Sequence, residues 1–131
     1  MILADTSAWV EFDRATGSAV DRRLTELIAG GGPLAVTEPV IMEVVAGART
    51  PRRATDLRNL LLSFALLRFD PVVDFDGAAE VYRRCRRAGV TPRGMIDCMI
   101  VTVARRNGAS ILAVDSDFTR VCAVLGVPTE V

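Results

Sequence analysis

Short apolar runs alternate with longer helical patterns along this chain, and the alternation limits the fold more than any other property of the sequence. The apolar runs at residues 2–4 and 110–114 have the length of buried strands. Other segments repeat their apolar residues at helical spacing, as Leu57, Leu60 and Leu61 do. Strands that alternate with helices predict an α/β fold with a central parallel sheet flanked by helices.

Element boundaries follow from the same patterns and from the positions of glycine, proline and aspartate. We expect strands at residues 2–4, 34–36, 67–69, 110–114 and 127–131. A helix is expected at residues 74–88, where the acids come first and the arginines last, an order that suits the helix dipole. No Ser/Gly/Pro-rich linker divides the chain, and its 131 residues are a usual domain size, so residues 1–131 are expected to form a single domain.

Two absences from the composition limit the possible chemistry, because the chain has no histidine and all 16 of its basic residues are arginine. The first absence excludes a histidine general base, Ser-His-Asp and Cys-His nucleophiles, and metal sites built on imidazole. The second excludes Schiff-base chemistry and a P-loop lysine. Carboxylates, hydroxyls, arginines and any metal that carboxylates can hold remain available for catalysis.

The cysteines, and the lack of a signal-peptide or membrane-span pattern, favour a cytoplasmic protein. Cys85, Cys98 and Cys122 are odd in number and widely spaced, so we expect small buried hydrophobes in a reducing compartment rather than disulfides or a zinc site. The 16 acidic residues balance the arginines, and this neutrality predicts no bulk attraction to nucleic acid or membrane. The first residues do not resemble a signal peptide, and no apolar run is long enough to span a bilayer.

Several acidic residues occupy positions where chemistry is expected. Asp5 and Asp115 each follow a predicted strand, and ligands bind at the carboxyl ends of parallel strands. Glu43 lies within an apolar helix and Asp97 in the first turn of another, where an unpartnered carboxylate is costly to bury. Each acid also has a structural explanation. Asp5, Asp115 and Asp117 are suitable helix caps, Asp97 complements a helix N-terminus, and Glu43 is suited to a buried pair with an arginine.

Together, these acids favour a cation site. Carboxylates within about 4–6 Å of one another repel unless a cation compensates them. Oxygen ligands without imidazole or thiolate select Mg²⁺ or Mn²⁺ over zinc or copper. Such an ion activates water and neutralises charge on a phosphate. Metal-assisted phosphodiester hydrolysis is therefore the reaction that these residues suit.

The same residues carry a resemblance to a known family. The segments D-T-S-A-W at residues 5–9, M-I-D-C at 95–98 and D-S-D-F at 115–118, with Glu43 between the first two, resemble the PIN-domain family and specifically its VapC-type toxins. The resemblance covers essentially the whole chain. It implies a PIN-like fold and a Mg²⁺- or Mn²⁺-dependent endoribonuclease acting on RNA. It also implies a toxin–antitoxin system, in which the toxin is usually a homodimer and a cognate VapB-type antitoxin holds it inactive.

Carried over residue by residue, the resemblance implies an acidic quartet of Asp5, Glu43, Asp97 and Asp115, with Asp117 as a nearby fifth acid. Metal ligands are expected among Asp5, Asp97 and Asp115, directly or through water. Glu43 and Asp115 would complete the ligand set or orient the attacking water.

Substrate-binding residues are sought among hydroxyls and arginines. Thr6 and Ser7 are suited to hydrogen-bond a carboxylate or a phosphate, although helix capping also explains them. Arg93, in the loop before the Asp97 helix, is the candidate for a substrate phosphate, although a surface or structural role also explains it.

Two other functions fit parts of this pattern. A receiver-type phosphoacceptor domain has a similar length and an acidic Mg²⁺ pocket, but it uses a lysine that this chain lacks. A non-catalytic binding module would need the acids only as caps and salt-bridge partners.

Overall fold

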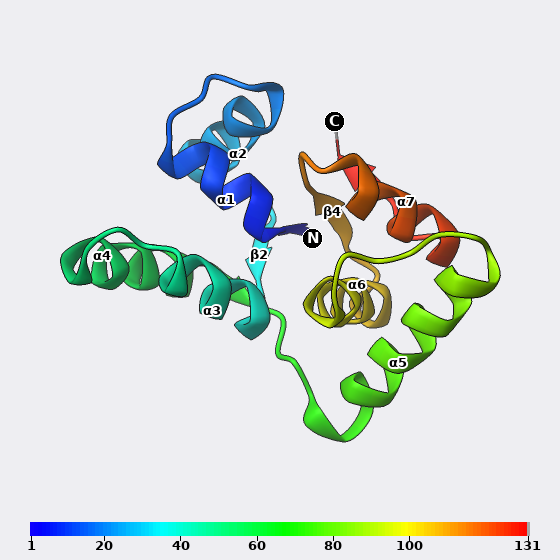
Figure 1. Cartoon of the computed structure of the whole chain (residues 1–131). Helices are drawn as coiled ribbons and strands as arrows, with labels where there is room; N and C mark the ends of the chain where they lie inside the picture. Colours follow the sequence, from blue (N-terminus) through cyan, green and yellow to red (C-terminus); the bar gives the residue numbers. More distant parts are fainter. Residues whose placement is uncertain (131) are drawn as a thin grey trace.

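A five-stranded parallel sheet lies at the centre of the computed structural model, which describes residues 1–130 (Figure 1). The strands are β1 (Ile2–Ala4), β2 (Leu34–Val36), β3 (Ala65–Leu66), β4 (Ser110–Leu112) and β5 (Thr129–Glu130). Their order is β3-β2-β1-β4-β5, and every neighbouring pair is parallel. The predicted α/β fold with a central parallel sheet is confirmed.

Helices cover both faces of this sheet. They are α1 (Thr6–Asp13), α2 (Ala19–Gly30), α3 (Glu38–Ala46), α4 (Pro51–Leu62), α5 (Pro71–Arg87), α6 (Met95–Asn107) and α7 (Ser116–Leu125). Helices α1 to α4 gather on one side of the strands and α5 to α7 on the other (Figure 1). Right-handed crossovers require this division. The connections from β1 to β2 and from β2 to β3, which contain α1 to α4, run across the sheet in one direction, and those from β3 to β4 and from β4 to β5, which contain α5 to α7, run in the other. Within residues 1–130, no helix has the length and apolarity needed to cross a bilayer.

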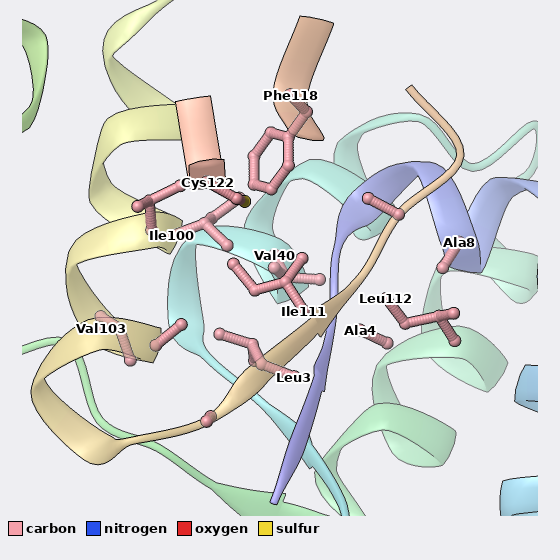
Figure 2. Packing of buried hydrophobic residues seen from close by; sticks show 14 of the residues in the cluster. Leu3, Ala4, Ala8, Val40, Ile100, Val103, Ile111, Leu112, Phe118 and Cys122 are labelled. Carbon is pink, nitrogen blue, oxygen red and sulfur yellow. The ribbon is translucent and has the colours of Figure 1, made fainter. Parts of the chain in front are cut away.

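Buried apolar side chains fix the central strand β1 and its neighbour β4. Leu3 of β1 and Ile111 of β4 are fully buried, because a strand covered by helices on both faces buries almost every residue. Ile100 from α6 and Phe118 from α7 belong to the same core cluster (Figure 2). The packing holds the carboxyl ends of β1 and β4 side by side. Asp5 directly follows β1, and Asp115 lies three residues after the end of β4.

The structure moves some of the predicted boundaries. The strand expected at residues 67–69 lies at Ala65–Leu66, an exposed two-residue edge strand with too little apolar pattern to locate it. Helix α5 begins at Pro71 rather than at residue 74, because Asp70 caps it by accepting a hydrogen bond from the Val72 amide at 2.9 Å. The last strand, expected at residues 127–131, is confined to Thr129–Glu130, and Val131 lies outside the described residues.

Candidate active site

Asp5 follows β1 directly and caps helix α1. Its Oδ2 accepts hydrogen bonds from the amide and the hydroxyl of Ser7, at 3.1 and 2.7 Å. The residue is only 1% exposed. Burial raises the pKa of the Asp5 carboxyl to about 6, against the Ser7 hydrogen bonds that lower it, and the charge of Asp97 raises it further.

Thr6 and Ser7 direct their hydroxyls toward acidic residues. Thr6 Oγ1 donates a 2.6 Å hydrogen bond to Glu43 Oε1, which joins α1 to α3. The Ser7 hydroxyl donates to Asp5 and also accepts from the Val114 amide at 3.1 Å, so it joins α1 to the segment after β4. The observed contacts are therefore to carboxylates, one of the two partners expected for these hydroxyls, and their predicted role in substrate binding stays a prediction.

Asp97 and Asp115 share one arginine. Arg93 Nε lies 3.3 Å from Asp97 Oδ2, and its Nη1 lies 2.5 Å from Asp115 Oδ2. Asp97 is buried in the first turn of α6, and burial raises the pKa of its carboxyl. Arg93 lowers that pKa in part, whereas the charges of Glu43 and Asp115 raise it. Asp115 also caps α7, because its Oδ1 accepts from the Asp117 and Phe118 amides.

These side chains border a cleft of about 280 Å³. It is lined by Asp5, Thr6, Ser7, Val10, Glu11, Glu43, Arg93, Asp97 and Val114. The structure thus brings Asp5, Glu43 and Asp97 together around one hollow and ties Asp115 to it through Arg93. Glu11 also lines the cleft but is not among the predicted site residues, although its position four residues after Ser7 places both on one face of α1.

Asp117 does not join this group. Its side chain is 56% exposed and forms an ion pair with Arg120 at 3.5 Å, one turn further along α7. Its backbone amide, rather than its carboxylate, contacts Asp115. The structure therefore gives the expected fifth acid no contact with the cleft, and its catalytic role stays a prediction.

The chemistry of the donor set fits a hard divalent cation. The cleft offers carboxylate oxygens but no imidazole, since the chain has no histidine. The buried, free thiols of Cys98 and Cys122 do not line the cleft, and burial raises the pKa of Cys98 to about 11 and of Cys122 to about 12. Among residues 1–130, no three acids or cysteines stand close enough to form a ready-made metal cage. Asp97 and Asp115 instead share the Arg93 guanidinium.

Comparison with known proteins gives a consistent family. The family model described as PIN domain matches residues 2–124. Ribonuclease VapC11 of Mycobacterium tuberculosis and VapC ribonuclease Mb1587 of Mycobacterium bovis are each 43% identical over 119 residues, which cover 90% of this chain and 89% of each relative. A solved structure of VapBC2 from Rickettsia felis bound to a promoter DNA fragment matches with a TM-score of 0.74 at 18% identity, over 99% of this chain and 98% of that one. The chain therefore belongs to the PIN domain family and, within it, to the VapC-type proteins.

Proposed function

We propose that the protein is the toxin of a type II toxin–antitoxin system and hydrolyses RNA phosphodiester bonds as a Mg²⁺- or Mn²⁺-dependent endoribonuclease. One observation carries the proposal. Asp5 and Asp97 are buried beside Glu43 in one cleft, and burial raises the pKa of both aspartates, as it does for acids that lack sufficient compensating charge. The identity to relatives named as VapC ribonucleases supports the same activity. A single PIN domain over residues 1–131 is part of the proposal.

The contacts support the following proposed roles. Asp5, Asp97 and Asp115 would hold the divalent ion, directly or through water. Glu43, fixed by Thr6, completes the ligand set or orients the attacking water. When bound, the ion lowers the pKa of a coordinated water and neutralises charge on the phosphate. Ser7 keeps Asp5 in place through two hydrogen bonds to Oδ2.

Arg93 is the proposed contact to the substrate phosphate. Its side chain is 52% exposed at the edge of the cleft, so an RNA backbone can approach its guanidinium. A local contact of this kind is needed because the chain has no net charge to attract RNA at a distance.

Family membership extends the proposal to partners. We propose a cognate VapB-type antitoxin, a homodimer, and a cytoplasmic location where the three free cysteines stay reduced. An apolar surface groove of about 270 Å³ supports contacts with another chain, and it is lined by Glu38, Pro39, Met42, Phe69, Pro71, Phe75 and Met99. Light scattering tests the homodimer. A dimeric mass is expected for the native chain, and a monomeric mass would remove this part of the proposal.

Cleavage of a labelled RNA by purified protein tests the activity. We expect cleavage with Mg²⁺ or Mn²⁺, none with a chelator, and recovery when the ion is restored. Asp5→Asn keeps the size and the hydrogen-bond acceptor of the native side chain but loses its charge, and should abolish cleavage. Asp76→Asn, an exposed acid on α5, is the matched control and should cut normally. Cleavage that survives the chelator, or that Asp5→Asn retains in full, would refute the proposed mechanism.

A further inference from the structure

Arg93 links two carboxylates that the proposed function assigns to a cation. Its Nε contacts Asp97 at 3.3 Å and its Nη1 contacts Asp115 at 2.5 Å. Asp97 lies in the first turn of α6 and Asp115 caps α7, so one guanidinium joins the starts of two helices. Arg93 therefore supplies positive charge to the same oxygens that a divalent ion would bind.

The surroundings of Arg93 allow its side chain to leave these carboxylates. The cleft of about 280 Å³ and a second hollow of about 350 Å³ both include Arg93, Asp97 and Glu43 in their walls. The side chain is 52% exposed, so it can turn without displacing packed core atoms. The adjacent N-cap residue of α6, Gly94, makes no side-chain capping hydrogen bond, so rotation of the Arg93 side chain breaks none.

We propose that Arg93 and a divalent cation compete for Asp97 and Asp115, so that Arg93 is an internal counter-cation which the ion releases toward the substrate phosphate. This inference rests on the proposed function, because it assumes that the cleft binds such an ion. It adds an order of events. The ion binds first, and only then does the guanidinium become free for RNA.

The physical basis is the repulsion between like charges. A guanidinium at about 4–6 Å from a divalent ion weakens ion binding about tenfold, even with the screening of water. Arginine keeps its charge at any pH in use, so protonation cannot relieve the repulsion. Only movement of the Arg93 side chain away from the ion can relieve it.

Calorimetric titration with MnCl₂ tests the competition directly, without RNA and without turnover. We expect Arg93→Ala to bind Mn²⁺ about tenfold more tightly than the native chain. Arg93→Lys keeps the charge but cannot bridge both carboxylates, so its affinity should lie between the two. Arg105→Ala is the matched control, because it removes the same charge from the other end of α6, about 12 Å from Asp97 along the helix axis. Its Mn²⁺ affinity should stay within about twofold of the native value.

A second readout separates competition from a merely structural salt bridge. Arg93→Ala should raise KM for RNA while it tightens Mn²⁺ binding. A variant that only loosened the cleft would raise KM and also weaken Mn²⁺ binding. Thermal unfolding of each variant checks that it is folded. Equal or weaker Mn²⁺ binding by folded Arg93→Ala, with normal binding by the native chain, would overturn this inference alone. If the native chain binds no Mn²⁺ either, the metal site of the proposed function falls with it.

Discussion

Two buried aspartates occupy the first turns of neighbouring helices but are paired differently. Asp74 of α5 accepts hydrogen bonds from Arg106 Nε at 2.9 Å and Nη2 at 2.7 Å, and from the Asp70 amide at 2.7 Å. Asp97 of α6 has one contact to Arg93 at 3.3 Å, and Arg93 lies closer to Asp115. The first acid has an arginine to itself, whereas the second shares one with another acid.

The pKa values move in opposite directions for this reason. Burial alone would raise the pKa of Asp74, but the Arg106 and Asp70 hydrogen bonds outweigh it and lower the pKa. Burial raises the pKa of Asp97, and Arg93 offsets that only in part while Glu43 and Asp115 add to it. A fully paired acid stabilises the fold, and an under-paired one has capacity left for an added cation.

The largest expected effect is on activity. Asp97→Asn should lower RNA cleavage by about a thousandfold, because it removes a charge that the reaction uses. Its free energy of unfolding should not fall, since the buried charge is poorly compensated. Initial rates and urea unfolding on the same preparation measure both. A variant that loses stability and activity in parallel would erase the distinction between the two acids.

The reverse outcome is expected for Asp74→Asn. The substitution leaves Arg106 without its carboxylate and should lower the free energy of unfolding by about 2 kcal/mol, reduced from a fully buried pair because the Arg106 side chain is 38% exposed. Cleavage per folded molecule should be unchanged. Unfolding in urea, followed by circular dichroism, gives the stability change, and no measurable loss would show that the pair is not structural.

The pH dependence of stability sharpens the comparison. The pKa of Asp5 is about 6 in the folded protein and 3.8 as the ordinary value, so between these pH values the folded chain holds a proton that the unfolded chain has lost. Stability without metal should therefore fall by about 1–2 kcal/mol as pH rises from 4.5 to 7. The pKa of Asp74 is lowered, so its contribution to stability is lost mainly as pH falls below its ordinary pKa of 3.8, which is outside this range.

Urea unfolding at several pH values in chelator checks this dependence. Asp5→Asn should reduce the fall, because it removes one of the two carboxyls whose pKa burial raises, the other being Asp97, whereas Asp74→Asn should leave the slope intact. A native chain that gains stability over this range would contradict the assignment of the raised pKa to a buried, under-compensated Asp5.

A smaller effect is expected where a hydroxyl positions an acid. Thr6→Val keeps the shape of the side chain but removes the 2.6 Å hydrogen bond to Glu43, and should lower kcat about tenfold with little change in KM. Thr55→Val on α4, an exposed threonine bonded only to a backbone carbonyl, is the control. Steady-state kinetics on both decides, and equal kcat values would show that Glu43 needs no such support.

The smallest effect is expected for Asp117. Its carboxylate faces solvent and Arg120, so Asp117→Asn should change the cleavage rate by less than about threefold. Initial rates measured beside Asp115→Asn test this. A loss as large as that of Asp115→Asn would instead support Asp117 as a fifth catalytic acid.

The sequence predicts where the cleft lies better than it predicts which arginine each acid contacts. Asp5 and Asp115 are found from it because strand and helix periodicities mark the strand ends, and parallel strands bring those ends to one edge. Asp74 and Asp97 look alike in sequence, since each is an acid in the first turn of a helix. Only tertiary contacts, Arg106 across from α5 and Arg93 shared between α6 and α7, distinguish them.

Unfolding in the presence of Mn²⁺ tests the central claim, that the under-paired acids bind a cation and the paired one does not. A ligand at about a hundred times its Kd stabilises the folded state by about 2.7 kcal/mol. We expect Mn²⁺ to stabilise the native chain and Asp74→Asn by equal amounts and to leave Asp97→Asn unchanged. Equal stabilisation of Asp97→Asn and the native chain would contradict the account.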